Sequence, residues 1–268
     1  MQKETAPTQK KRAAKANYSA PALDKGLDIL ELLSTEGGGL TLSEVAQKLN
    51  RSVSEIFRML AVLEQRHYLS FDAASERYCL TLKMFVLAHR HAPVKRLTAA
   101  ALPVMQKMAR ELEQSCHLVI YYQSRGLVIA QTDSPAARNF SVRLGAAAPL
   151  LDTCSGHLLL AFAGDDERKD MLKAQQAAIT GSINASALDK VIERVRRQGY
   201  ESVTSTQIHG VHDIGYPVFD YSGRIVAALV VPFLEHLDGS HQISLEAARG
   251  ILEKSALAVS TSLGYVPT

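Results

Sequence analysis

Apolar residues recur every three to four positions in the first quarter of the chain, which predicts short amphipathic helices. The first predicted helix has Ser19 as its N-cap and Pro21 in its first turn, a common start signal. Three glycines at 37–39 end this helix. Its apolar stripe is expected at Leu23, Leu27 and Leu30, with Ile29 and Leu33 beside it.

Two capping boxes mark the starts of two further helices. Thr41 is followed three positions later by Glu44, and Ser52 by Glu55, so each pair can satisfy free amides at a helix start. Asn50, between them, is expected in the left-handed conformation that ends a helix. The buried stripes are expected at Leu42, Val45, Ala46 and Leu49 in the first helix and at Ile56, Met59, Leu60 and Leu63 in the second. Two short helices joined by such a turn predict a helix-turn-helix unit.

A β-hairpin is predicted directly after these helices. Its strands lie at 68–71 and 77–80, with a polar turn at 72–76 between them. A helix-turn-helix pattern alone is shared by many helical hairpins. The hairpin after it and the helix before it together indicate a winged helix-turn-helix, whose second helix enters the DNA major groove.

The rest of the chain mixes strands with helices, which predicts an α+β domain. A linking helix is expected at 82–91, followed by a longer helix that contains Leu97 and Leu112. The expected strands are 117–122, 127–130, 140–144, 200–203, 213–219 and 224–231, and the expected later helices are 153–162, 186–198 and 244–263. We therefore divide the chain into an arm (1–18), a DNA-binding head (19–81), a linker helix (82–95) and a second domain (96–268).

Composition adds three constraints. The 268 residues are 47% hydrophobic, but no apolar run approaches the ~18–20 residues of a membrane span, and no signal peptide is expected. The net charge is +3, and residues 1–18 hold five basic residues against one glutamate. This arm can contact DNA phosphates, or it is a solvated tail. The three scattered cysteines, Cys79, Cys116 and Cys154, favour a reducing cytoplasm.

Several runs of the chain resemble the IclR-type transcriptional regulators. They are residues 22–33, 40–49 and 58–64 and the wing residues 68–80, and the resemblance continues to the C-terminus. It implies a winged helix-turn-helix joined by a helix to a GAF/profilin-like effector-binding domain. The expected function is a ligand-responsive bacterial transcriptional regulator. Its expected partners are double-stranded DNA, a small-molecule effector and further copies of the chain, as a homodimer or a dimer of dimers; no cofactor or catalytic activity is expected.

DNA contacts are expected from recognition-helix positions that lie off its buried stripe. Arg58 can reach a phosphate or a guanine edge. Val53 and Phe57 stand where the family commonly has Lys and His; they can contact thymine methyl groups, or they are buried against the first helix. Glu55 is interpreted as a cap rather than as a cytosine reader. The full expected set is Thr41, Ser52, Val53, Ser54, Phe57, Arg58 and Arg77.

The resemblance also implies an effector pocket on one face of the sheet. Its positions fall on Leu144, Cys154, Ser155, Val203, Asp213, Val230 and Pro232. Val203 stands where an acidic residue is usual, and Val230 and Pro232 stand where serines are usual. A pocket with these changes should suit a larger, partly apolar or aromatic organic ligand, with Asp213 as its charged anchor.

Other functions fit parts of the same region. Cys154 and His157 are spaced to face each other on a helix as nucleophile and base, although a tight pocket wall explains Cys154 equally well. His209, His212 and Asp213 could hold a metal, or the histidines lie on the surface near a pocket rim. The alternatives to a regulator are therefore an enzyme with a regulatory DNA-binding head and an architectural DNA binder that ignores ligands.

Overall fold

The computed structural model describes residues 20–90, 92–179, 183–235 and 243–267. The chain divides into two compact units, Met1–Arg90 and His91–Thr268, and each is described by itself. The finer division into arm, head, linker helix and second domain stays a prediction, and the basic arm at 1–18 lies outside the described residues. In the described ranges, no helix combines the length and the apolar character needed to cross a bilayer.

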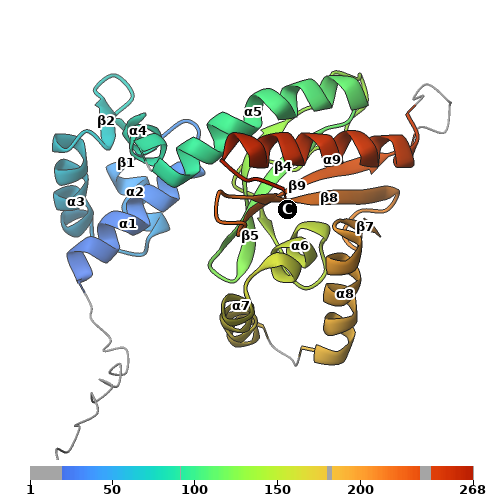
Figure 1. Ribbon diagram of the computed structural model, residues 1–268. Coiled ribbons are helices and arrows are strands. Elements are labelled where there is room, and N and C mark those ends of the chain that lie inside the picture. Colours follow the sequence, from blue (N-terminus) through green and yellow to red (C-terminus); the bar gives the residue numbers. More distant parts are fainter. Residues whose placement is uncertain (1–19, 91, 180–182, 236–242, 268) are drawn as a thin grey trace, which may run out of the picture. The chain divides into compact units, whose positions relative to one another are not determined.

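The first unit is a winged helix-turn-helix, as the sequence predicts (Figure 1). Its strands pair antiparallel in the order β1-β3-β2. In chain order its elements are α1 (Pro21–Ser34), β1 (Leu40–Thr41), α2 (Leu42–Lys48), α3 (Val53–Gln65), β2 (Leu69–Asp72), β3 (Arg77–Leu80) and α4 (Lys83–Arg90). Both predicted capping boxes form, and Asn50 has the expected positive φ of 51°.

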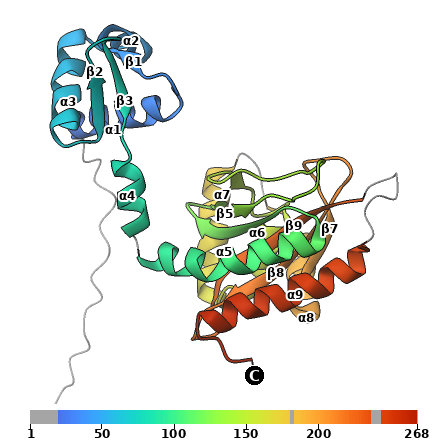
Figure 2. The same cartoon turned by 90° about the horizontal axis from the view of Figure 1, so that it is seen from above.

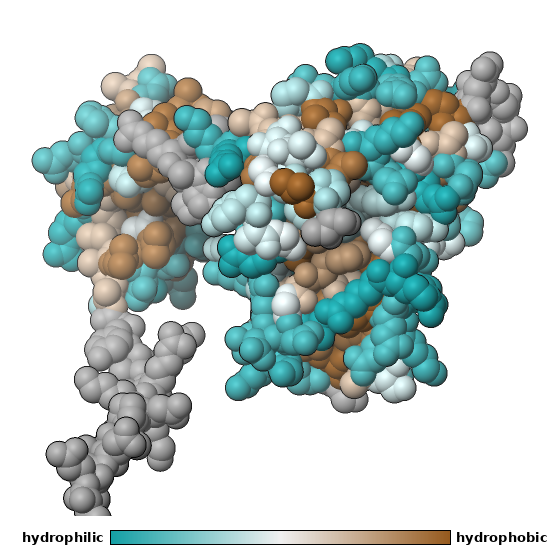
Figure 3. Space-filling view, viewed as in Figure 1, coloured by the Kyte–Doolittle hydropathy of each residue, from teal (hydrophilic) through white to brown (hydrophobic). Residues whose placement is uncertain are grey.

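The first helix departs from the prediction in two ways. Its N-cap is Ala20 rather than Ser19, because Pro21 at the first helical position holds the residue before it out of the helical conformation. Alanine has no polar side chain, so this helix start has no side-chain cap bond. Its buried residues are Ile29 and Leu33, whereas Leu23 and Leu27 are 62% and 47% exposed. The two sets lie about a third of a turn apart on the helix, so the predicted leucine stripe faces outward and leaves apolar side chains over α1 (Figure 3).

The second unit is an α+β domain, as predicted. Its sheet has the order β6-β5-β4-β9-β8-β7, with antiparallel neighbours throughout the described strands. Helices α5 and α9 cover one face, and α6, α7 and α8 lie on the other (Figures 1 and 2). The bounds are α5 (Ala92–Leu112), β4 (Cys116–Tyr122), β5 (Arg125–Thr132), β6 (Ala147–Ala148), α6 (Cys154–Phe162), α7 (Asp165–Ala178), α8 (Ala185–Gln198), β7 (Glu201–Thr204), β8 (Val211–Phe219), β9 (Ile225–Leu234) and α9 (Leu245–Ser262).

Two elements of this unit were not predicted correctly. The strand expected at 140–144 is a loop, and pairing with β5 begins at Ala147, after Gly145 has turned the chain with a φ of 80°. Helix α7 was missed because its first half is almost entirely charged, which hides the apolar period. Met171 is one of its few buried positions.

Helix α6 lies unusually close to its neighbours because two glycines leave room for it. A Cβ on Gly156 would overlap the carbonyl group of Leu150. A Cβ on Gly215, in β8, would lie 2.8 Å from the Cys154 sulfur and equally close to Leu158. All of α6 except Phe162 is buried, so the helix is part of the core and its ends are fixed in place.

We predict opposite stability effects for two glycine-to-alanine changes. Gly156→Ala should lower the free energy of unfolding by about 1–3 kcal/mol, because the new methyl group must displace α6 from Leu150. Gly250→Ala, in the middle of α9 with open space around its Cα, should raise it by about 0.5–1 kcal/mol, since alanine favours a helix. Urea unfolding of the two variants measures both. An equal change in the two would show that α6 is not closely packed.

Candidate DNA interface and effector site

The recognition helix α3 presents a mixed polar and apolar surface at its start. Ser52 is its N-cap, and Ser54 and Arg58 are exposed. Val53 and Phe57 are 49% and 53% exposed, so the alternative that they are buried against the first helix is wrong. The expected DNA-facing residues of α3 therefore share one accessible surface, while Ile56 and Leu60 hold the helix to the core.

Glu55 is committed to the fold rather than to a base. Its carboxylate pairs with Lys25 of α1 at 2.5 Å and closes the capping box with Ser52. These bonds, first the one from Lys25 and then those from Ser52, lower the pKa of Glu55 to about 2. Its interpretation as a cap is confirmed by the capping box.

Thr41 and Arg77 join the wing to the helix-turn-helix. Thr41 caps α2. Arg77 donates to the carbonyl oxygen of Gly39 at 2.7 Å and pairs with the Glu44 carboxylate at 3.2 Å. These bonds occupy much of the guanidinium, so a DNA contact by Arg77 would be an additional role and stays a prediction.

Four of the seven expected effector residues line one small cavity in the second unit. Cys154 and Ser155 reach it from the start of α6, Asp213 from β8 and Val230 from β9, around about 80 Å³. Val203 and Pro232 lie opposite Asp213 on the neighbouring strands but are not part of the lining. Leu144 is 66% exposed on the loop before β6 and is also outside it.

Asp213 is the more buried of the two described acidic residues that line this cavity, since Asp152 is exposed. Its burial raises the pKa of its carboxyl from 3.8 to about 6, against the opposing effect of a hydrogen bond from Ser205. Close to neutral pH this carboxyl therefore exchanges a proton readily, and its charged form is incompletely solvated. Such a group gains from a ligand that brings a hydrogen-bond donor.

His117 is a polar group of the cavity that sequence analysis missed. It stands at the start of β4 and is buried, and among the described residues its Nδ1 has no hydrogen-bond partner. Burial lowers the pKa of its imidazole to about 4, so the ring is neutral at physiological pH. Buried polar atoms without a partner are rare in native proteins, and because the His117 ring lines the cavity, it is a candidate contact for a molecule that enters there.

The N-terminus of α6 supplies the third polar feature. Thr153 caps the helix by accepting from the amide of Gly156 at 3.1 Å. The amides of Cys154 and Ser155 come before the first helical hydrogen bond and point out of the helix end, where the partial positive charge favours an anion. The cavity therefore combines a helix N-terminus, two carboxyl groups and a neutral imidazole.

Comparisons with known proteins agree with both units. The family described as "Bacterial transcriptional regulator IclR C-terminal" matches residues 90–261, and the "IclR helix-turn-helix domain" matches residues 22–73. The first of these matches spans more than half of the chain. The chain belongs to the IclR family.

Individual IclR-family proteins resemble the chain over nearly its full length. The HTH-type transcriptional regulator KdgR of Escherichia coli is 28% identical over 92% of this chain and 94% of its own. The Thermotoga maritima IclR crystal structure has a TM-score of 0.72 at 24% identity and covers 91% of this chain and 98% of that one. An IclR homologue from Microbacterium hydrocarbonoxydans, complexed with 4-hydroxybenzoate, has a TM-score of 0.74 at 21% identity over 90% and 98%.

This family membership makes the chain a DNA-binding transcriptional regulator with a C-terminal effector-binding domain. The nucleophile–base pair considered for Cys154 and His157 does not form, and burial raises the pKa of the Cys154 thiol well above the ordinary value. Both ring nitrogens of His157 have other partners, Glu201 at 2.7 Å and the Leu151 carbonyl oxygen at 2.9 Å. Cys154 is therefore a wall residue over Gly215, and its thiol donates to the carbonyl oxygen of Glu201 at 3.8 Å.

Glu201 forms the second buried polar group that sequence analysis missed in this regulator. It is fully buried at the start of β7 and receives two hydrogen bonds from Arg194 of α8, at 2.9 and 2.8 Å, as well as the one from His157. His157 and Arg194 outweigh burial and keep its pKa below the usual value. The sequence did contain a signal for this group, because Glu201 lies within an expected strand. A buried carboxylate in a strand requires a cationic partner.

The suggested metal ligands do not converge. His212 bonds to Ser202 through Nε2 at 2.8 Å, and neighbouring strand residues such as His212 and Asp213 point to opposite faces of the sheet. Within the residues that the structure describes, no three His, Cys, Asp or Glu side chains form a group able to hold a metal ion.

We predict that Asp213→Asn changes the pH dependence of stability. The folded-state pKa of about 6 lies above the ordinary 3.8, so folding favours the protonated form. This stabilisation is complete below about pH 4 and is lost as the pH rises through 6. The unfolding free energy of the wild type, relative to Asp213→Asn, should thus fall by about 2–3 kcal/mol between pH 4 and pH 7. Urea unfolding across this range measures it, and a constant difference would contradict the buried carboxyl.

Proposed function

We propose that the small cavity at the start of α6 is the effector site of this regulator, and that its effector is a small hydroxy acid. The observation that carries the proposal is the unpartnered Nδ1 of His117, whose ring lines the same cavity as Asp213 and the start of α6. An effector held there shifts the DNA-binding equilibrium through its different affinity for the two states of the protein.

Each polar group of the cavity matches one part of such a ligand. A carboxylate fits the amides of Cys154 and Ser155 at the helix end. A second carboxylate is disfavoured by the neighbouring Asp213, whereas a hydroxyl donor stabilises its charged form. The neutral imidazole of His117 can donate or accept, so it can complete the hydrogen bonds of either group.

The volume of the cavity favours a ligand of a few carbon atoms. About 80 Å³ is smaller than the ~150 Å³ cavity that accommodates benzene. A larger aromatic effector, which the sequence favoured, therefore requires its walls at 140–148 or 205–208 to move outward. The Microbacterium homologue is complexed with 4-hydroxybenzoate, which carries a carboxylate and a hydroxyl group on a ring, so an aromatic ligand with the same two groups is the alternative.

Operator titrations with defined acids test this effector site. The affinity of the full chain for DNA from upstream of its own gene is measured with lactate, with propionate, which lacks the hydroxyl group, and with 4-hydroxybenzoate. Lactate should change the affinity at concentrations at which propionate does not. Asp213→Ala should abolish the response and leave ligand-free DNA binding intact, while Asp170→Ala, an exposed carboxylate on α7, should respond like the wild type. A response to lactate that survives in Asp213→Ala would overturn the assignment.

For DNA recognition we propose that the exposed start of α3 lies in the major groove. Arg58 and Ser54 supply hydrogen bonds to bases or phosphates, and Val53 and Phe57 supply apolar contacts to thymine methyl groups. Ser52 and Thr41, at the two helix starts, are placed for phosphate contacts. The apolar pair is the unusual part, since it favours A·T steps.

We also propose that the regulator is a homodimer or a dimer of dimers in the bacterial cytoplasm. One recognition helix offers few base contacts, and dimers read two half-sites. The exposed Leu23 and Leu27 on α1 support an apolar contact between two heads. The free Cys79, Cys116 and Cys154 and the DNA partner support a reducing compartment.

We predict that Arg58→Ala weakens operator binding by roughly 1–3 kcal/mol at fixed salt, because it removes a base or phosphate contact from an exposed position. Arg66→Ala removes the same charge from the other end of α3 and should change the affinity much less. Fluorescence anisotropy with a labelled operator measures both. Equal losses in the two variants would mean that only the overall charge matters.

A further inference from the structure

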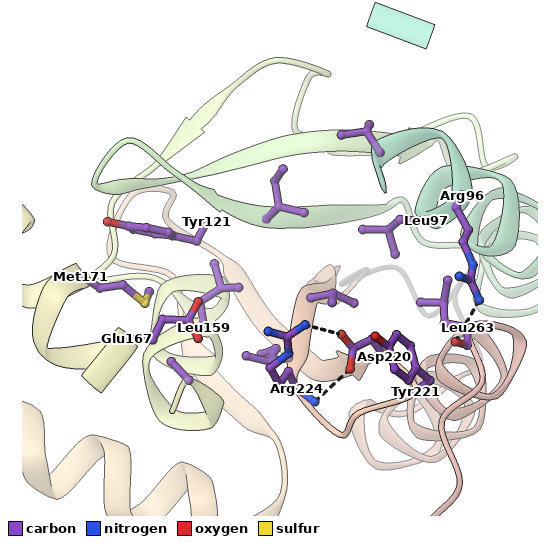
Figure 4. A pocket seen from close by; sticks show the side chains of 15 residues that line it. Arg96, Leu97, Tyr121, Leu159, Glu167, Met171, Asp220, Tyr221, Arg224 and Leu263 are labelled. Carbon is purple, nitrogen blue, oxygen red and sulfur yellow. Dashed lines mark hydrogen bonds and ion pairs between the residues drawn. The ribbon is translucent and has the colours of Figure 1, made fainter. Parts of the chain in front are cut away.

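A second and much larger cavity lies at the other end of α6. It encloses about 660 Å³ between the first turns of α5, the end of β4, the second half of α6, the start of α7 and the β8–β9 turn (Figure 4). All of its lining residues belong to the second unit. This volume is typical of pockets for small organic molecules, which measure about 300–1,000 Å³.

The inner wall of this cavity is apolar and buried. It is formed by Leu97 of α5, Leu159 and Ala163 at the end of α6, Met171 of α7 and Leu263 after α9. An apolar hollow of this size therefore gains stability from an apolar molecule that displaces water from it.

Two arginines at its rim bind to the protein rather than reach into the cavity. Arg224 pairs with Asp220 at 3.4 Å, and Arg96 donates to the carbonyl oxygen of Leu263 at 3.4 Å; Figure 4 shows both pairs. Glu167 is exposed at the start of α7. The hydroxyl groups of Tyr121 and Tyr221 are neutral polar groups of the lining. This distribution favours a neutral ligand over an ionic one.

The two cavities are separate but share two elements. Strand β4 begins at the polar cavity with His117 and reaches the apolar cavity with Tyr121. Helix α6 contributes Ser155 to the first and Leu159 to the second. The apolar cavity also contacts the first turns of α5, the helix through which the chain enters this domain from the linker.

We infer that this apolar cavity is a second ligand site, which binds a neutral aromatic or alicyclic molecule of two or more rings. Its walls provide the apolar contacts, and Tyr121 provides one hydrogen bond. The inference does not depend on the hydroxy-acid site, because the two cavities share no lining residue.

The test uses N-phenyl-1-naphthylamine, a neutral three-ring dye that fluoresces in apolar surroundings. The full chain should bind one dye per chain, saturably and at micromolar concentration. Ala163→Phe and Val94→Trp each place a large side chain in the cavity and should weaken binding at least tenfold. Ala187→Phe, on the exposed surface of α8, should bind like the wild type. Because Val94 is only half-buried, Val94→Trp decides the question if Ala163→Phe does not fold.

Three results would overturn the inference. The first is dye binding that does not saturate. The second is equal binding by the wild type and the folded Val94→Trp variant. The third is an apparent Kd that rises with protein concentration, because it would show that a second copy of the chain covers the cavity instead. A missing lactate response would change none of these dye-binding measurements, so either proposed site can be refuted without the other.

Discussion

The close approach of α6 to the sheet determines the arrangement of the effector-binding domain. Gly156 lets the helix contact the carbonyl group of Leu150, and Gly215 lets Cys154 and Leu158 rest on β8. Because the helix is buried on nearly all sides, its two ends cannot move independently of the core. The polar cavity lies at the first end and the apolar cavity at the second, so a rigid helix connects both sites.

Buried polar groups beside α6 fall into two kinds. Glu201 is fully satisfied, by Arg194 and His157, and so it holds α8, β7 and α6 together. Among the described residues, Asp213 has only a hydrogen bond from Ser205 to offset its burial, which raises its pKa, and His117 has an unpartnered ring nitrogen. Buried polar groups with all their hydrogen bonds made stabilise a fold, whereas polar groups in a cavity that lack partners gain hydrogen bonds when a ligand binds. This difference distinguishes Glu201, which holds the fold together, from Asp213 and His117, which line the cavity.

The head could be predicted in detail because its signals are local. Capping boxes at Thr41 and Ser52 fix two helix starts within four residues each. The outward-facing leucines of α1 could not be predicted, because periodicity shows that a helix has an apolar stripe but not which of two adjacent stripes meets α3. Leu23 and Ile29 differ only in what packs against them.

The residues of the candidate effector site came from the family resemblance rather than from local signals. Cys154, Ser155, Asp213 and Val230 were placed through resemblance to the family, and they do line one cavity. His117 was missed because nothing near it in the sequence indicates that β4 brings it beside α6. The volume of a cavity also depends on how distant segments pack, and the sequence therefore led to a larger expected ligand than the observed 80 Å³ favours.

The state of His117 offers the most direct measurement of the central claim, that an effector completes the polar cavity at the start of α6. The full chain, labelled with ¹⁵N in its histidines, would be titrated with lactate, with the His117 signals assigned through His117→Gln. The account predicts that the Nδ1 resonance of His117 shifts as the ligand saturates, while the resonances of His157, which is already bonded at both nitrogens, stay unchanged. A lactate response in DNA affinity without any shift at His117 would contradict it.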